Sequence, residues 1–285
     1  MKHLTQHQQG LTAVFVAAIL WSSGGLLIKL VTLTPTQISF FRCSVAAIAF
    51  AIIFRKKILR YNRLTVLNSF FYAGVLFFYV MAMKETTAAN AIFLQSTAPI
   101  YVLIFEPIIN KTRYDKSNII TIGICFFGMI LFFLGDLTPG QLEGNIYGLL
   151  AGILFAAFFL GMKKNDRKYQ QSSIFLGNII VALICLPFIF TIDELAFSDL
   201  WMVSFLGVFQ IAIAYAFFSF GLKRVFAVEA SIISMVEPVL TPFWVFIGYG
   251  EVPATTAIIG GFIIIVVISV RTIQMGKALF GRKLT

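Results

Sequence analysis

Ten long apolar segments, separated by short polar connections, set the strongest limit on how this chain folds. Each segment holds about 20 residues, the length that a helix needs to cross the roughly 30 Å hydrocarbon core of a bilayer. Because that core offers no water, a spanning backbone must satisfy its own hydrogen bonds, as a helix does. Hydrophobic residues make up 59% of the chain and charged residues 12%, which leaves no room for a separate water-soluble domain. We expect an all-α integral membrane protein with ten transmembrane helices at residues 11–31, 35–54, 64–83, 87–108, 117–135, 145–162, 174–192, 199–220, 226–247 and 254–272.

The basic residues favour one side of these segments. Of the 22 Lys and Arg residues, nineteen fall in the terminal regions and in alternate connections; Lys29 and Lys84 fall on the other side, and Arg42 lies inside a segment. Basic loops remain in the cytoplasm, so the pattern predicts an inner (plasma) membrane protein with both termini cytoplasmic. The net charge of +10 is thereby explained by topology, and no nucleic-acid partner is expected.

Residues for metal or acid–base chemistry are scarce. The three cysteines, Cys43, Cys125 and Cys185, lie inside apolar segments, and the only histidines are His3 and His7 near the N-terminus. Nothing resembles a nucleotide-binding P-loop. We therefore expect no metal, no cofactor and no enzyme activity.

The two halves of the chain repeat weakly at a separation of about 139 residues. Four matched pairs carry the repeat: Lys84 with Lys223, Ala88 with Ala227, Ala91 with Ala230, and Pro99 with Pro238. Five spans per half is an odd number, so the halves would face opposite ways, as in many secondary transporters. The predicted division is residues 11–135 for the first repeat, 145–272 for the second and 273–285 for a cytoplasmic tail.

Over nearly its whole length the chain resembles the drug/metabolite transporter superfamily, specifically the ten-helix proteins with two EamA domains. The resemblance is carried, in chain order, by Trp21-Ser22-Ser23, Pro35 with Arg42, Lys84 to Pro99, Glu237-Pro238-Val239 and Gly250-Glu251. It implies the same ten-helix fold and a carrier of amino acids, nucleotide-sugar-like metabolites, choline or similar solutes, although the fold does not fix a substrate. Lys111-Thr112-Arg113 and Ala98 stand where symmetry would place Gly250-Glu251 and Glu237, so we expect an asymmetric site.

Glu237 is the acid expected at the middle of the ninth span, where a charge costs roughly 2.5–3.5 kcal/mol or more. Helical spacing places it on one face with Ser234, Thr241 and Trp244. Two interpretations stay open: a proton- or cation-binding carboxylate beside the substrate, or a carboxyl that caps backbone groups freed by Pro238.

Arg42 is the one cation inside a span, and it also has two interpretations. It could bind a carboxylate or phosphate with two hydrogen bonds, or pair with a helix end and fix packing. Aromatic rings, hydroxyls and an amide near the midplane are expected to complete a substrate pocket. The full set of candidate substrate-binding residues is Trp21, Ser22, Arg42, Tyr79, Gln95, Tyr101, Phe155, Tyr215, Ser219, Glu237, Thr241 and Trp244.

The leading hypothesis is a secondary transporter that exports amino acids or related metabolites by alternating access. An importer or exchanger of amines, nucleosides or other metabolites is the alternative. A membrane channel or a membrane-embedded transferase is disfavoured, because the chain lacks a continuous polar lining and clustered acid or histidine residues. The expected partners are a small-molecule substrate, the lipid bilayer and, through Glu237, protons; monomer and homodimer both stay open.

Overall fold

The computed structural model describes residues 5–110, 116–135, 141–222, 224, 233–234 and 236–281. Within these ranges all regular secondary structure is helical. The first half forms α1 (Gln6–Leu30), α2 (Pro35–Phe54), the short helix η1 (Arg55–Leu59), α3 (Arg63–Glu85), α4 (Ala88–Gln95), α5 (Ala98–Asn110) and α6 (Lys116–Gly135). The second half forms α7 (Gln141–Lys164), η2 (Arg167–Tyr169), α8 (Gln170–Cys185), η3 (Leu186–Thr191), α9 (Phe197–Phe205), the π-helical η4 (Leu206–Ile213), α10 (Ala214–Leu222), α12 (Val236–Tyr249) and α13 (Thr255–Gly281).

Seven helical stretches among the described residues are long and apolar enough to cross a membrane. Four of them join consecutive elements: α2 with η1, α4 with α5, α8 with η3, and α9 with η4 and α10. Two shorter apolar helices, Ile119–Gly128 and Ile258–Arg271, lie within α6 and α13. The prediction of an all-α integral membrane protein is confirmed.

Each predicted span overlaps one or more described helices, with differences near the C-terminus. Only residues 233–234 and 236–247 of the predicted span 226–247 are described, so the repeat partners Lys223, Ala227 and Ala230 lie outside the described residues. Helix α13 continues past residue 272 to Gly281, so the first part of the predicted tail is helical. The reason is that residues 273–281 contain no proline to interrupt the helix.

Side-chain caps fix where the early helices begin. Thr5 and Gln8 form a capping box at the start of α1, with the Gln8 amide N–H donating to Thr5 Oγ1 at 3.2 Å and the Thr5 N–H donating to Gln8 Oε1 at 2.9 Å. Thr34 and Gln37 repeat this arrangement at α2, where Pro35 occupies the first turn. These polar residues therefore mark helix starts that hydropathy alone leaves open.

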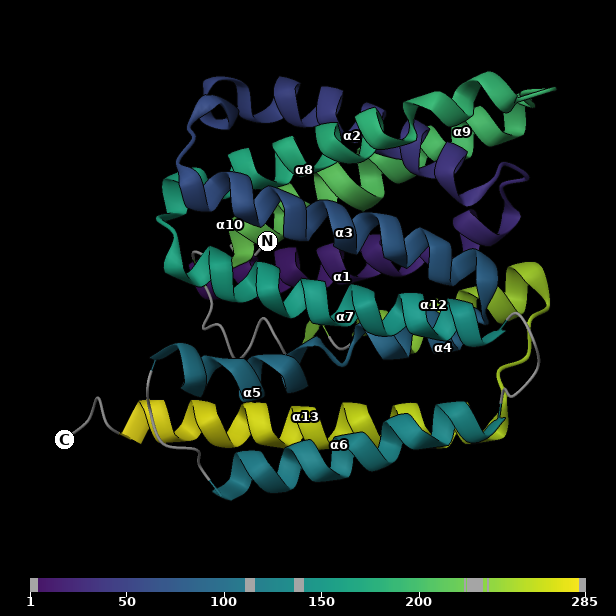
Figure 1. The fold of residues 1–285 in the computed structure, drawn as a ribbon. Coiled ribbons are helices and arrows are strands. Elements are labelled where there is room, and N and C mark those ends of the chain that lie inside the picture. The colour runs from purple at the N-terminus through teal and green to yellow at the C-terminus, as the bar shows by residue number, and fades with distance from the viewer. Residues whose placement is uncertain are drawn as a thin grey trace.

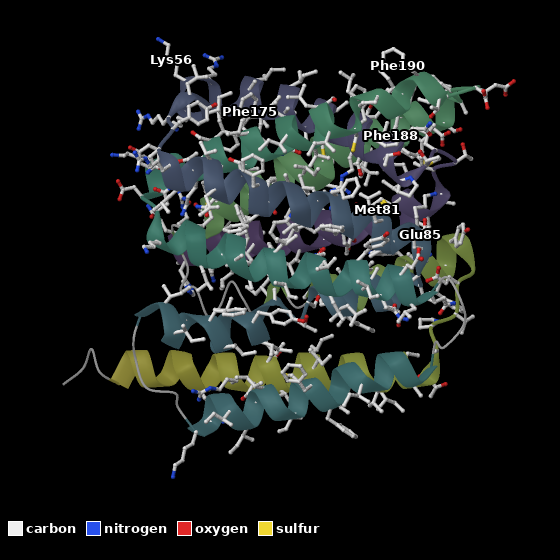
Figure 2. The ribbon with its side chains drawn as sticks, in the orientation of Figure 1. Lys56, Met81, Glu85, Phe175, Phe188 and Phe190 are labelled. Atoms are coloured by element: carbon white, nitrogen blue, oxygen red, sulfur yellow. The ribbon has the colours of Figure 1, made fainter. Side chains whose placement is uncertain are left out.

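The helices run side by side between two ends of the bundle (Figure 1). We call the end where α1, α3 and α8 begin the proximal end, marked by Lys56 in Figure 2, and the end where α1 and α3 finish the distal end, marked by Glu85. Helix α3 packs against α7 and α8, α1 against α10 and α12, and α2 against α8 and η4. Helices α6 and α13 lie together as a separate layer beyond α5 (Figure 1).

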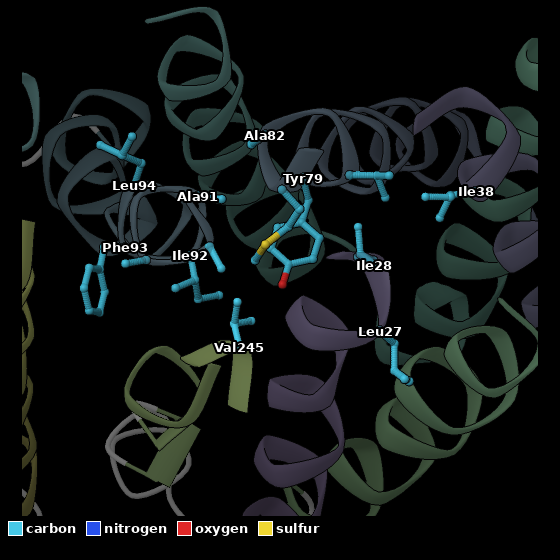
Figure 3. Packing of buried hydrophobic residues seen from close by; sticks show 14 of the residues in the cluster. Leu27, Ile28, Ile38, Tyr79, Ala82, Ala91, Ile92, Phe93, Leu94 and Val245 are labelled. Carbon is cyan, nitrogen blue, oxygen red and sulfur yellow. The ribbon is translucent and has the colours of Figure 1, made fainter. Parts of the chain in front are cut away.

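Two apolar clusters hold the bundle together. One joins α1, α3, α4 and α12, and Figure 3 shows Tyr79 there among Ile28, Ala91, Ile92 and Val245. The other joins α2, α3, α7, α8 and η4 around Phe50, Tyr72 and Phe158. Many large apolar side chains on the outer faces are exposed, as expected where lipid tails cover them. The polar residues discussed below lie between and beyond these clusters.

Helix α7 approaches α3 so closely at Gly144 that no side chain fits. A Cβ atom there would lie 2.5 Å from backbone atoms of Glu85 and Thr86. Gly144→Ala should therefore lower the midpoint of thermal unfolding in detergent by several degrees, as expected for overpacking of about 1–3 kcal/mol. Gly123→Ala is the control, because a Cβ there meets no atom within 4 Å. Equal midpoints for the two variants would contradict this packing.

Candidate functional site

An aromatic cluster joins three helices near the middle of the bundle. The Trp21 ring on α1 meets Tyr215 on α10 at 5.3 Å between centroids and Phe218 at 5.0 Å. Tyr215 in turn meets Tyr72 on α3 edge to face at 5.6 Å. Such offset and edge-to-face pairs are favourable, so the three helices are held at a defined spacing around these rings. The structure thus brings together the predicted residues Trp21 and Tyr215 and adds Tyr72.

Ser22 on α1 forms hydrogen bonds with two predicted residues of α12, Thr241 and Trp244. The Trp244 indole N–H donates to Ser22 Oγ at 3.1 Å, and the Ser22 hydroxyl donates to the Ile19 carbonyl at 2.7 Å. The Thr241 hydroxyl lies 3.4 Å from the Ser22 carbonyl and 2.9 Å from the Glu237 carbonyl. These groups are therefore largely satisfied by the protein, which gives them a role in fixing α12 against α1.

Arg42 on α2 is only 1% exposed, and its Nε and Nη1 atoms have no hydrogen-bond partner. In a hydrocarbon environment a buried cation with unmet donors is strongly unfavourable. One interpretation from the sequence is that Arg42 pairs with a helix end. The Nε and Nη1 atoms show no such pairing. Their environment instead suits an added anion.

Two tyrosines lie close enough to interact electrostatically with both Arg42 on α2 and Glu237 on α12. Tyr79 and Tyr215 each interact with both charges, and Tyr72 interacts with Arg42. The hydroxyl of Tyr79 is buried and has no hydrogen-bond partner, and Figure 3 shows it pointing towards α1 and α12. Glu237 itself is half-buried. We call Trp21, Arg42, Tyr72, Tyr79, Tyr215 and Glu237 the central cluster.

Four predicted residues lie away from the centre of this cluster. Gln95 ends α4 with its Oε1 buried and unpartnered, and Tyr101 lies on α5 beside Thr97. Phe155 packs on Phe159 at 4.8 Å, at the edge of the second apolar cluster. Ser219 is half-buried on α10. Their roles in binding stay predictions.

Sequence reasoning missed Tyr72 and Gln210. Tyr72 lies seven residues before Tyr79, so helical spacing places both on one face of α3, and this signal was available. Gln210 is the one amide in an otherwise apolar part of its span, and it is 7% exposed with its Oε1 unpartnered. Both residues are buried polar groups near the middle of the bundle.

Several polar groups at the distal end of the bundle are, by contrast, paired across both halves of the chain. Lys29 forms a salt bridge of 2.8 Å with Glu251 and donates to the Thr86 carbonyl at 2.7 Å. Glu251 also accepts a hydrogen bond from the Ala88 N–H, and the Thr86 hydroxyl donates to Asn145 Oδ1 at 2.7 Å. One ion pair therefore ties α1, the start of α4 and the connection between α12 and α13.

Two further contacts close the same end. Lys84 donates to the Val31 carbonyl at 2.5 Å, and Asp199 at the start of α9 accepts from the Thr32 N–H at 2.9 Å and its hydroxyl at 2.5 Å. Lys29 and Lys84 are the two basic residues that the sequence analysis places on the side of the membrane opposite to the nineteen others. We call the whole set the distal lock: Lys29, Thr32, Lys84, Thr86, Asp199 and Glu251.

An apolar cavity of about 280 Å³ opens beside α1, α9 and α12. Trp244 lies in its wall, so the cavity borders the Trp244–Ser22 contact described above. Its lining is Ile19, Ser23, Leu26, Leu27, Trp201, Phe205 and Trp244. Among the described residues no three or more His, Cys, Asp or Glu side chains gather where they could hold a metal ion.

The sequence matches the model of the EamA-like transporter family twice, over residues 8–134 and 142–272. A protein of Archaeoglobus fulgidus named as an uncharacterized transporter is 27% identical over 66% of this chain and 68% of its own length. The uncharacterized transporter YdfC of Bacillus subtilis is 23% identical over 86% of this chain and 84% of its own length. A solved crystal structure superposes with a TM-score of 0.64 at 16% identity, covering 94% of this chain and 98% of the other, which supports the fold alone.

The two interpretations of Arg42 predict opposite effects on stability. If its unmet donors await a ligand, Arg42→Met should keep or raise the midpoint of thermal unfolding of the ligand-free protein, because replacing a buried charge by an apolar side chain is often neutral or stabilising by about 1–4 kcal/mol. A midpoint several degrees lower would instead assign Arg42 to packing. The measurement is thermal unfolding in detergent without added solute.

Proposed function

The chain belongs to the EamA-like transporter family, and from this premise we propose that it is a secondary transporter of small zwitterionic metabolites, namely amino acids or close relatives, that works by alternating access in the inner membrane. The observation that carries the substrate class is the pair of opposite charges in the central cluster. Arg42 offers unmet donors to a carboxylate, and Glu237 offers an acceptor to an ammonium group. The proposed direction of transport is export.

The tyrosines between these charges support the same proposal. Their rings give apolar walls and cation–π faces, while the unpartnered hydroxyl of Tyr79 gives a bound solute a polar contact. A site of this kind binds the carboxylate and the ammonium group of an amino acid and leaves its side chain packed against the aromatic rings. Coupling to protons through Glu237 is part of the proposal, because a half-buried carboxyl that meets the ligand is suited to exchange a proton with it.

The distal lock supports alternating access. It holds one end of the bundle closed with contacts between residues of both halves, and such contacts are reversible when the halves rock. Helix α1 runs from the proximal to the distal end, and α7, the first helix of the second half, runs the opposite way; this supports an inverted repeat. The bias of Lys and Arg towards the proximal end supports placing that end, with both termini, in the cytoplasm.

A channel is the alternative from another class. It would need an open polar path through both ends, whereas the distal lock crosses one end with an ion pair and several hydrogen bonds. Carriers differ from channels because they saturate and exchange solute for solute, so counterflow separates the two.

The proposal predicts saturable counterflow of an amino acid in proteoliposomes screened with amino acids, amines and nucleosides. Arg42→Met should reduce the initial rate at least about a hundredfold, since the carboxylate loses its charged partner. In the parent a pH gradient should change the rate, and Glu237→Gln should remove that dependence. Unsaturable flux, or full activity of both variants, would contradict the proposal.

Opening of the distal lock is testable by labelling. Ser39 is 1% exposed near the distal start of α2, so in a variant without the native cysteines Ser39→Cys should react slowly with an impermeant maleimide. Glu251→Gln should raise the labelling rate about tenfold, the effect of roughly 1.4 kcal/mol lost from the closed state. Glu143→Gln is the control, because Glu143 is exposed at the same end. Equal rates for both variants would contradict the role of the lock.

A further inference from the structure

The middle stretch of the eighth predicted span, η4, departs from ordinary α-helix geometry. Residues Leu206–Ile213 are π-helical, between α9 and α10. The π-helix is rare, occurs mostly as short stretches inside α-helices and is frequently found at functional sites. Gly207 lets this stretch approach α2 closely, since a Cβ there would lie 2.7 Å from the Arg42 carbonyl. The irregular stretch is therefore seated against the backbone of the residue that carries the buried cation.

Gln210 lies at the centre of η4 and its amide reaches α1. A Cβ on Gly24 would lie 2.9 Å from Gln210 Nε2 and 3.2 Å from its Cδ, so the amide covers this glycine. The side chain is 7% exposed, and its Oε1 has no hydrogen-bond partner. In an apolar interior a carbonyl oxygen without a donor is unfavourable, so this oxygen is suited to accept a hydrogen bond from a ligand.

The position of Gln210 joins it to the central cluster. Trp21 and Gly24 lie one turn apart on α1, and they meet Tyr215 and Gln210, which lie about one turn apart along η4 and α10. Gln210 therefore contacts α1 about one helical turn from the Trp21–Tyr215 pair, on the distal side of the aromatic rings. A solute held at those rings would meet the Gln210 amide on its way to the distal end.

We propose that Gln210 is a specificity-determining residue whose Oε1 accepts a hydrogen bond from the N–H or O–H donor that a substrate carries beside its carboxylate. This rests on the proposed function and deepens it. Arg42 requires an acceptor from the ligand and Gln210 requires a donor, so together they select amino or hydroxy acids over plain carboxylates. A simple carboxylate would satisfy Arg42 and leave the Gln210 oxygen unmet, which is a strong basis for rejection.

The test measures selectivity rather than flux. Proteoliposome counterflow is run with the twenty common amino acids and, for each one transported, with its analogue that lacks the α-amino group. The parent should prefer the amino acid, and Gln210→Leu should reduce this preference at least about tenfold while it keeps transport of the analogue. Gly24→Ala should reduce the preference in the same direction, because the added methyl displaces the amide. Gly123→Ala, where nothing lies within 4 Å, should leave it unchanged.

The outcomes separate the two proposals. If the parent transports none of the amino acids, the proposed function is wrong and this inference falls with it. If the parent transports one and Arg42→Met abolishes its uptake, but Gln210→Leu and Gly24→Ala keep the full preference, the proposed function stands and the inference about Gln210 is wrong. If Gln210→Leu does not fold, Gly24→Ala alone tests the inference. That variant keeps the Gln210 side chain and changes only the position of its amide.

Discussion

The absence of water from hydrocarbon governs this structure, because every polar group inside the bundle must find a partner in the protein, in a solute or in water that enters. The charged groups of the distal lock and the buried polar groups at the centre differ in this respect. At the distal end Lys29, Glu251 and Asp199 are paired with the backbone and with each other. At the centre Arg42 and Gln210 hold buried atoms without partners. The paired groups close the distal end, and the unpaired atoms of Arg42 and Gln210 are the ones that we propose bind a solute.

The same division explains why α1 is the structural axis of the site. Its small residues let α12 and η4 approach, and its polar and aromatic residues bond to them; Ser22 meets Trp244, Trp21 meets Tyr215, and Gly24 meets Gln210. Movement of α1 against α10 or α12 would therefore change the central cluster, and its end at Lys29 would change the distal lock with it. A single helix thus links the binding groups with the contacts that close the distal end.

Much of this fold follows from the sequence, because span length and the bias of basic residues depend on composition within short windows. The small and aromatic residues of α1, the buried Arg42 and the Glu237 region were also identifiable, since a charge or an aromatic–polar pattern inside an apolar span is unusual. The partners of these groups could not be predicted from the sequence. Lys29 and Glu251 lie 222 positions apart, and nothing local predicts their pairing. The π-helical geometry of η4 depends on how α2 and α1 pack on it, which no local pattern of η4 reveals.

The central claim is that the unmet donors of Arg42 are the binding site of a solute carboxylate. The most direct measurement is an experimentally determined structure in lipid nanodiscs with a transported amino acid bound. The account predicts the carboxylate within about 3 Å of Arg42 Nε and Nη1, beside the rings of Tyr72 and Tyr215. A structure in which those two nitrogens bond to the protein itself, with the solute bound elsewhere, would contradict it.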